Sequence, residues 1–372
     1  MRDYPIWSPR LWLGMDLYTW YGLVYAKALK ISKNRLGLVV VTTLVTAVQT
    51  AVASITLRWE KSIGLNNKVI LDSQAPIFII GYWRSGTTLL HELLSCYCQL
   101  KAPTTYQCFC PNHFLITEKI VTSMFSWVLP VRRGFDDVRL HWASPQEDEF
   151  ALLMMGAPSP YRRIAFPSVG HQLESLEIRG LPKEQQDKWY KALSTFVKRL
   201  MLIDERRLVL KNPCHTARIS SILEIFPGAK FIFISRNPGQ MIPSSMKMWK
   251  YLDYYHGLES SASVDYKSYA LELFKRVDDA YVVDKKLLTK NNLVEIRYED
   301  LIEDPVGILE LTTKCLGLEG LTKDKHRLNT TISQIKAYSQ QKYLIPSEDM
   351  MSIAEITSEY CKRYNYIVKK ER

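Results

Sequence analysis

The sequence predicts an α/β fold, with a parallel sheet flanked by helices and an N-terminal helical module before it. From residue 69 onward, short apolar runs that end in turn residues alternate with amphipathic stretches, which is typical of α/β proteins. The chain has 372 residues, 47% of them hydrophobic, enough for one large domain with an appendage or for two domains. The polar, turn-rich stretch 66–76 is the best boundary, so we predict a module of residues 1–68 and a domain of residues 69–372.

The N-terminal module combines an aromatic and basic segment, residues 11–30, with an uncharged run, residues 36–57. As a helix, this run is long enough to cross a hydrocarbon layer of about 30 Å. Threonines recur on one side of the run and valines on the other, which also fits a helix that is docked on protein or lies in the membrane interface. We favour peripheral membrane contact through residues 1–65. A membrane span and a soluble helical hairpin are the alternatives.

Charge and cysteine content limit the partners and the compartment. Lys and Arg number 49 against 38 Asp and Glu, and this net charge of +11 suits phosphate-bearing ligands, nucleic acid or an anionic membrane. The odd count of seven cysteines favours reduced thiols, and therefore a cytoplasmic protein. The cysteines at positions 96, 98, 108 and 110 lack the usual knuckle spacing, so we expect no metal.

Four apolar runs have the length and composition of buried parallel strands, and helical patterns lie between them. The predicted strands are residues 77–80, 208–210, 230–234 and 293–296. The predicted helices are residues 87–98, 183–203, 216–226 and 268–288.

A turn bracketed by two glycines follows the first strand, with the sequence Gly81-Tyr-Trp-Arg-Ser-Gly86, and an amphipathic helix pattern begins at Thr87. The spacing is that of a phosphate loop, so the sheet is predicted to be of the P-loop type, and backbone N–H groups at such a turn bind anions. Thr87 stands where nucleotide triphosphatases carry their lysine, and the later strands end in Lys211 and Arg236 rather than Asp. The loop therefore favours a ligand with one 5′-phosphate and no bridging metal. An ordinary strand-to-helix turn is the alternative.

A second signal follows the third predicted strand. Arg236 stands at the carboxyl end of this apolar run, where open α/β sheets bind ligands, and Ser244 comes eight residues later, in or beside the next helix start. A guanidinium and a hydroxyl that converge there could hold another phosphate. An arginine paired with a surface carboxylate is the alternative.

Together the two signals resemble the sulfotransferase family. The loop and the following Thr87-Thr88 resemble the family's 5′-phosphosulfate loop, and Arg236 with Ser244 matches its 3′-phosphate pair at the same spacing. Residues 208–215 and 297–305 resemble elements of the bacterial and tyrosylprotein branches, and the likeness covers about residues 75–345. The resemblance implies a P-loop-type fold and transfer of a sulfuryl group from 3′-phosphoadenosine 5′-phosphosulfate, without a metal, to a hydroxyl or amine.

The resemblance also implies roles for individual residues. Arg84 is the first candidate to neutralise the leaving phosphate oxygen, and Lys211 is the second, by likeness to the Lys-x-Pro element of the tyrosylprotein branch. The cofactor-binding set comprises Arg84, Ser85, Gly86, Thr87 and Thr88 at the 5′-phosphate, and Arg236 and Ser244 at the 3′-phosphate, opposite ends of the donor.

The general base is open between two residues. Glu147 belongs to three successive carboxylates that would raise one another's proton affinity, although an acidic helix N-terminus has the same sequence. His215 is the second candidate, because an imidazole titrates near neutral pH and this one lies four residues from Lys211. His91, inside the predicted helix after the loop, has the pattern of a structural residue or a pocket wall.

The sequence departs from the cytosolic steroid and phenol branch, since it lacks that branch's late Arg-Lys-Gly element and its Pro-Lys-Ser-Gly loop. Lys336 or Lys342 could cover the 3′-phosphate instead, although a solvated basic helix also explains them. Aromatic residues between positions 103 and 180 could wall an apolar acceptor pocket, and core packing explains them equally: Tyr106, Phe109, Phe114, Phe125 and Trp127. With the N-terminal module, they favour a small-molecule or lipid-like acceptor and no nucleic acid.

Two other classes of function are weighed against this one. A nucleotide kinase or hydrolase is disfavoured by the missing phosphate-loop lysine and strand-end Asp. A noncatalytic, membrane-tethered scaffold is disfavoured by a complete pair of anion sites.

Overall fold

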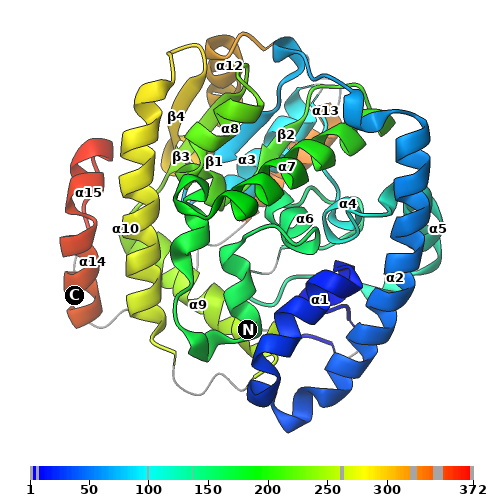
Figure 1. The fold of residues 1–372 in the computed structure, drawn as a ribbon. Coiled ribbons are helices and arrows are strands. Elements are labelled where there is room, and N and C mark those ends of the chain that lie inside the picture. Colours follow the sequence, from blue (N-terminus) through cyan, green and yellow to red (C-terminus); the bar gives the residue numbers. More distant parts are fainter. Residues whose placement is uncertain are drawn as a thin grey trace. The chain divides into compact units, whose positions relative to one another are not determined.

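The computed structural model describes residues 3–5, 8–98, 100–136, 138–259, 264–318, 325–337 and 347–368 (Figure 1). The chain divides into two compact units. Unit 1 comprises Met1–Val69, Pro103–Asp204 and Lys247–Asp265, and unit 2 comprises Ile70–Ala102, Glu205–Met246 and Tyr266–Arg372. The predicted boundary after residue 68 falls beside the first break, but the residues before it pack with two later segments. A division into domains of residues 1–68 and 69–372 stays a prediction.

Unit 2 contains the predicted parallel sheet. Its four strands lie in the order β2-β1-β3-β4, all parallel: β1 (Ile77–Ile80), β2 (Val209–Lys211), β3 (Lys230–Ser235) and β4 (Leu293–Arg297). In the register of the central strand, Ile77 is opposite Val209 on one side and Lys230 on the other. The α/β, P-loop-type fold is confirmed, and each strand lies within one residue of its predicted bounds.

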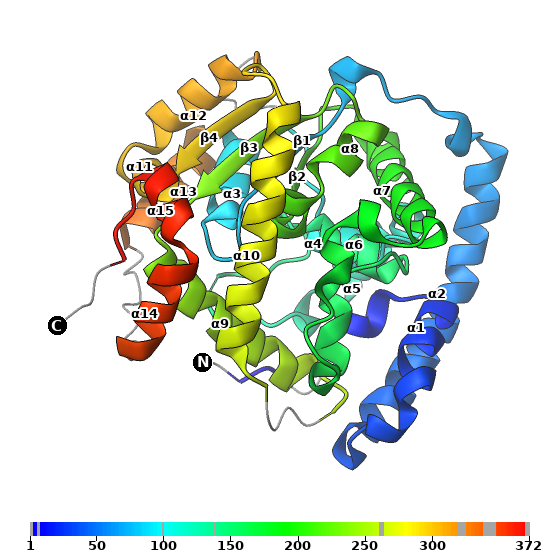
Figure 2. The ribbon, with the colours of Figure 1, turned by 60° about the vertical axis from the view of Figure 1, so that its left-hand side comes forward.

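Helices cover both faces of this sheet (Figures 1 and 2). Successive strand residues point to opposite faces, so Ile77 and Ile79 enter one core and Phe78 enters the other. The isoleucine face packs on α3 (Thr87–Tyr97), α11 (Tyr298–Glu303), α12 (Pro305–Cys315) and α13 (Lys325–Ala337). The phenylalanine face packs on α8 (Ile219–Ile225), α10 (Tyr266–Asp284) and α15 (Ser358–Tyr364), and α14 (Ser347–Ile356) contacts α10.

The predicted helices are found, with two changes at their ends. The helix predicted over residues 216–226 is divided into a 3₁₀ helix, Pro213–Ala217, and α8, because Arg218 has non-helical backbone angles. The Asp284 carboxylate accepts a hydrogen bond from the N–H of Ser220, which satisfies a donor in the first turn of α8. The helix predicted over residues 268–288 ends at Asp284 and continues as a 3₁₀ turn.

Unit 1 is mainly helical. It contains α1 (Leu17–Val24), α2 (Leu36–Ser62), α4 (Thr105–Phe109), α5 (Phe114–Met124), α6 (Asp148–Met154) and α7 (Lys183–Ile203). Helix α9 (Pro238–His256) begins in unit 2 and ends in unit 1. Two buried ion pairs stabilise unit 1: Arg199 binds Glu60 at 2.7 and 2.9 Å, and Arg163 binds Asp253 at 2.6 and 3.0 Å.

The uncharged run in the N-terminal module forms α2, which runs beside α1 (Figure 2). Trp20 Nε1 donates to Thr43 Oγ1 at 2.9 Å, and the backbone N–H of Leu17 donates to Thr50 Oγ1 at 2.8 Å. Within the described part of the chain, Lys33–Ser62 is the one helical segment long and apolar enough to cross a membrane by length and composition.

All seven cysteines are free thiols, and no group of three or more His, Cys, Asp or Glu among the described residues could hold a metal ion.

The Arg199–Glu60 pair leads to a prediction about stability. We expect Glu60→Ala to lower the free energy of unfolding by about 3 kcal/mol, because it leaves a buried guanidinium without its carboxylate. Asp187→Ala is the control, since its pair with Lys183 is solvent-exposed and contributes about 0.5 kcal/mol or less. Urea unfolding monitored by circular dichroism measures both. Equal losses in the two variants would contradict the prediction.

Candidate functional site

The loop between β1 and α3 makes close backbone contacts that only glycine permits at two positions. Gly81 and Gly86 have φ values of +145° and +105°. A Cβ at Gly81 would lie 2.6 Å from the carbonyl oxygen of Ile234 in β3, and a Cβ at Gly86 would lie 2.4 Å from the ring of Tyr298. The two glycines that the sequence predicts to bracket the loop therefore allow it to pack closely on β3 and Tyr298.

Arg84, between these glycines, also has a left-handed backbone conformation, with φ of 71°. This conformation costs a residue with a side chain on the order of 1 kcal/mol, and it persists where neighbouring contacts enforce it. Two such contacts are present. Arg84 Nε donates to Ser244 Oγ at 3.1 Å, and Arg236 Nη1 donates to the carbonyl oxygen of Arg84 at 2.9 Å.

The start of α3 leaves backbone N–H groups without a helical acceptor at the position where the sequence predicts anion binding. The first backbone bond of the helix runs from Leu90 N–H to the Gly86 carbonyl at 3.1 Å, so the N–H groups of Thr87 and Thr88 have no acceptor within the helix. Ser85 is fully buried, and its hydroxyl has no hydrogen-bond partner in the described structure. Backbone donors at a helix N-terminus and a nearby hydroxyl form a cradle for a phosphate.

Arg236 is held from three sides at the carboxyl end of β3. Its guanidinium lies 4.2 Å from the ring centre of Tyr298, and Nη2 donates to Gln240 Oε1 at 3.4 Å. Its backbone N–H donates to the hydroxyl of Tyr360, in α15, at 3.1 Å. Arg84, Arg236 and Ser244 thus form one contiguous cluster. The sequence predicts two groups at opposite ends of a ligand, and the structure brings members of both groups into direct contact.

Three further residues of the site are not marked by the sequence. Thr216 Oγ1 accepts from the N–H of Gly81 at 2.8 Å and donates to the Gly81 carbonyl at 3.1 Å, so it clamps the start of the loop. Tyr298 supports both Gly86 and Arg236, and Tyr360 holds the backbone of Arg236. Tyr298 does lie in a stretch that resembles the family, but a single sequence contains no signal for these contacts between distant segments.

Lys211 is buried at the end of β2, the strand beside β1, and so lies at the same sheet edge as the loop. His91, in α3, is also buried. Its Nε2 lies 3.1 Å from the carbonyl oxygen of Val209, which can only accept, so Nε2 carries the proton. Burial, with a smaller contribution from Lys211, lowers the pKa of His91 to about 3. His91 is therefore neutral at physiological pH, as expected for a structural residue.

The two candidate bases have different surroundings. His215 is fully buried, and its ring packs edge-on against Phe78 with 5.4 Å between ring centres. Glu147 immediately precedes α6 and is half-buried, and its Oε2 accepts from the hydroxyl of Tyr161 at 2.7 Å. Glu147 belongs to unit 1, whereas every other predicted site residue belongs to unit 2.

Of the two lysines suggested at the 3′-phosphate, Lys336 falls in α13 and Lys342 lies outside the described residues.

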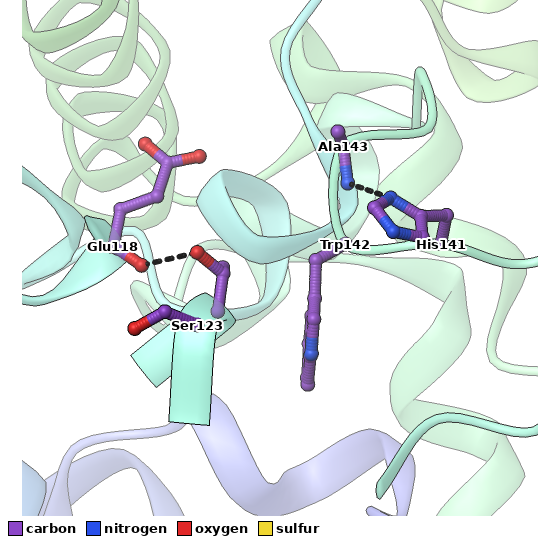
Figure 3. Close-up of a pocket in the computed structure, with 6 residues that line it drawn as sticks. Glu118, Ser123, His141, Trp142 and Ala143 are labelled. Carbon is purple, nitrogen blue, oxygen red and sulfur yellow. Dashed lines mark hydrogen bonds between the residues drawn. The ribbon is translucent and has the colours of Figure 1, made fainter. Parts of the chain in front are cut away.

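The aromatic residues predicted to wall an acceptor pocket do not act as one group. Tyr106 and Phe114 are buried in the core of unit 1, whereas Phe125 and Trp127 are exposed. A pocket of about 210 Å³ opens beside α5, and Figure 3 shows its side chains. None of the five predicted aromatic residues is among those that line it: Glu118, Thr122, Ser123, His141, Trp142 and Ala143.

The fold and the loop before α3 define an α/β protein of the P-loop type. A sequence profile of the sulfotransferase family matches residues 76–323, which include the whole cluster. The chain belongs to the sulfotransferase family, and it is an enzyme of that class.

Two curated relatives match nearly the whole chain. Each is the Omega-hydroxy-beta-dihydromenaquinone-9 sulfotransferase Stf3, from Mycobacterium bovis and from Mycobacterium tuberculosis, and each is 33% identical over 97% of this chain and 92% of the relative. Among solved structures, sulfotransferase STF9 from Mycobacterium avium shares the fold with a TM-score of 0.67, at 14% identity and full coverage of both chains. Sulfotransferase STF1 from Mycobacterium tuberculosis gives a TM-score of 0.62, at 15% identity and 94% coverage of both.

The threonine clamp on Gly81 can be tested by an isosteric substitution. We expect Thr216→Val to lower the free energy of unfolding by about 1–3 kcal/mol, because the buried N–H and carbonyl of Gly81 lose their partner. Thr312→Val is the matched control, since Thr312 is equally buried and its hydroxyl has no partner in the described structure. Urea unfolding compares the two variants, and a Thr312→Val loss as large as that of Thr216→Val would refute the clamp.

Proposed function

We propose that this sulfotransferase transfers the sulfuryl group of 3′-phosphoadenosine 5′-phosphosulfate to a hydroxyl of a hydrophobic, lipid-like acceptor, and that it works in the cytoplasm at a membrane surface. The observation that carries the proposal is the cluster of Arg84, Arg236 and Ser244 beside the N-terminus of α3. Two guanidiniums, a hydroxyl and helix N-terminal amides form a set of donors suited to a ligand with more than one phosphate. The seven free thiols support a reducing compartment.

The loop fits a phosphate group by shape as well as by charge. At Gly86 there is no room for a side chain beside Tyr298, so the backbone itself would contact the ligand. The buried hydroxyl of Ser85 has no partner in the described structure, and a phosphate oxygen would satisfy it. We assign Ser85, Gly86, Thr87 and Thr88 to the 5′-phosphate side of the donor.

We assign Arg236 and Ser244 to the 3′-phosphate. Arg236 already stacks on Tyr298 and donates to the Arg84 carbonyl, so its guanidinium is oriented before a ligand binds. Ser244 lies in the second turn of α9 and accepts from Arg84 Nε. This hydrogen bond therefore links Ser244, which we assign to the 3′-phosphate, with Arg84, which we assign to sulfuryl transfer.

The donor supplies an activated sulfuryl group, and its release leaves negative charge on a 5′-phosphate oxygen. A fixed cation that neutralises this charge accelerates transfer without any proton movement. Arg84 is our first candidate for this cation, because it lies within the loop and its strained backbone limits where its side chain can reach. Lys211 is the second candidate, since it is buried at the same sheet edge.

We propose Glu147 as the general base that takes the proton of the acceptor hydroxyl. Its partial exposure leaves the carboxylate accessible, and its bond with Tyr161 orients it. The alternative, His215, is fully buried and its ring packs edge-on against Phe78, whereas Glu147 is partly exposed.

The hydrophobic acceptor is supported by the curated relatives. The name of each states action on an ω-hydroxylated dihydromenaquinone, a long apolar molecule with a hydroxyl, and each matches 97% of this chain. The identity of 33% supports the same class of acceptor, an apolar chain that carries a hydroxyl group, rather than the same compound.

The donor assignments are tested by nucleotide binding and turnover in parallel. We expect adenosine 3′,5′-bisphosphate, without magnesium, to raise the melting temperature more than ATP does, because a ligand of the folded state stabilises it. Arg236→Ala should weaken this binding ten- to a hundredfold, the effect of about 1.5–3 kcal/mol for charged hydrogen bonds. Arg84→Ala should reduce turnover at least a hundredfold with a smaller effect on binding.

Arg276→Ala is the control for both variants, because this arginine forms an exposed ion pair on α10 of the same unit. Titration calorimetry measures the binding of the bisphosphate, and sulfate transfer from labelled donor measures turnover. Wild-type behaviour of Arg84→Ala or Arg236→Ala would disprove the role of that residue.

The base and the acceptor are tested in one assay, with a long-chain primary alcohol dispersed in detergent as acceptor. We expect Glu147→Gln to reduce kcat on the order of a hundredfold, the usual size of general-base catalysis, and to leave bisphosphate binding unchanged. His215→Gln is the comparison, and a kcat loss confined to it would reverse the assignment. A short-chain alcohol should react with lower kcat/KM than the long-chain alcohol, and equal values would argue against an apolar acceptor site.

A further inference from the structure

Helix α2 has the reverse of the amphipathic pattern expected for a water-soluble protein. The side chains that it buries include three threonines, Thr42, Thr46 and Thr56, each 0% exposed. Apolar side chains with more than half of their surface exposed lie on its outward face: Val41, Leu44, Val48 and Ile55. A helix in water buries its apolar face, so this helix is oriented for an apolar environment outside the protein.

Two of the three buried threonines have hydroxyls that find an acceptor within the helix. Thr46 Oγ1 donates to the Thr43 carbonyl at 3.0 Å, and Thr56 Oγ1 donates to the Val52 carbonyl at 3.2 Å. The inward face therefore combines threonines with one buried alanine, Ala53, and it packs on the rest of unit 1.

Contacts with other segments of unit 1 hold α2 at both ends and in the middle. Before the helix, Arg35 Nη2 donates to the Tyr254 carbonyl at 2.5 Å, and in the middle Thr50 accepts from the N–H of Leu17. Near its end, Glu60 forms the buried pair with Arg199. A helix that crossed a bilayer would have to carry these polar partners into the hydrocarbon, at a cost of several kcal/mol for each.

Exposed aromatic residues extend this apolar face onto α1 and the 3₁₀ turn that follows it. Tyr21 and Tyr25 stack with 4.8 Å between ring centres, and both are exposed, as is Tyr18. Leu29, in the turn between the two helices, is fully exposed. Tyrosine is enriched at the depth of lipid headgroups, where its ring contacts acyl chains and its hydroxyl contacts water.

The exposed charged side chains of residues 17–62 are all basic. Between Leu17 and Ser62 the single acidic residue is Glu60, which is buried against Arg199. Exposed basic side chains flank the apolar face at both ends: Lys30 and Lys33 before α2, and Arg58 and Lys61 near its end. Such a face would repel a second copy of itself and attract an anionic surface.

We propose that the outward face of α1 and α2, the α1–α2 surface, docks onto an anionic lipid bilayer with α2 lying along the membrane rather than crossing it. We define the surface by six residues: Tyr21, Leu29, Val41, Leu44, Val48 and Ile55. This docking rests on the proposed function, because that function supplies the lipid-like acceptor. It adds the surface through which the enzyme reaches the lipid phase. Bilayer binding needs neither donor nor acceptor, so it is tested independently of catalysis.

The test compares two valine-to-glutamate variants of equal exposure. Val48 is 66% exposed on the α1–α2 surface, and Val283 is 64% exposed on α10 of unit 2. Purified protein is added to vesicles of phosphatidylcholine with phosphatidylglycerol, and the bound fraction is measured by flotation. We expect Val48→Glu to weaken binding at least tenfold and Val283→Glu to bind like the wild type. Wild-type binding by Val48→Glu, or no binding by the wild type, would overturn the proposal.

Two further measurements fix the lipid chemistry and the mode of contact. Lys30→Glu combined with Lys33→Glu should weaken binding to anionic vesicles and leave binding to pure phosphatidylcholine unchanged, and equal loss on both would remove the anionic requirement. Bound protein should transfer to fresh vesicles within minutes. Retention by the original vesicles would indicate a spanning helix and overturn the docking mode.

Two controls separate the alternatives. Light scattering after size exclusion should give the same mass for the wild type and Val48→Glu. A wild-type dimer that Val48→Glu converts to a monomer would mean that a second copy covers this face, and the proposal would fail. The thermal shift by adenosine 3′,5′-bisphosphate should be the same in both proteins, so loss of bilayer binding with an intact shift assigns the defect to the surface rather than to the donor site.

Discussion

The site depends on the close approach of the loop 81–86 to β3 and Tyr298. At Gly81 and Gly86 the loop passes so near its neighbours that no side chain would fit, and these two contacts fix where α3 begins. The N–H groups of the first turn of α3 and the buried hydroxyl of Ser85 follow from that position. The left-handed backbone of Arg84 belongs to the same bend, so the conformation of the arginine and the anion cradle have one structural cause.

Two like-charged side chains share this small region, and the surrounding structure reduces their mutual repulsion. Arg236 faces the negative side of the Tyr298 ring and the carbonyl oxygen of Arg84, while Arg84 donates to the hydroxyl of Ser244. The two guanidiniums concentrate positive charge in this cluster, which favours an anionic ligand. In the proposed mechanism, hydrogen-bond donors fixed in this way need little reorganisation during sulfuryl transfer, which is the basis of electrostatic catalysis.

The sequence predicts the parts of this site that arise from local chemistry. Buried parallel strands are continuous apolar runs, so all four strands could be located, and the glycine spacing marks the loop. The Thr216 clamp joins residues 135 positions apart, and the support of Arg236 by Tyr360 joins residues 124 apart, so no local pattern reveals them. The sequence also does not reveal which face of α2 is buried. Threonines on one side and valines on the other indicate an amphipathic helix, but they do not indicate which side packs on the protein.

The reversed orientation of α2 has an energetic consequence that limits how it meets a membrane. Transfer of a fully exposed aliphatic side chain out of water is worth about 1.5–3 kcal/mol, and the outward side chains of α2 would transfer only part of their surface. Each basic residue near an anionic bilayer adds about 1 kcal/mol. A few such contributions, set against the entropy lost on binding, correspond to moderate and reversible attachment. Reversible attachment suits the function proposed above, in which the sulfuryl donor is dissolved in water and the acceptor is dissolved in lipid.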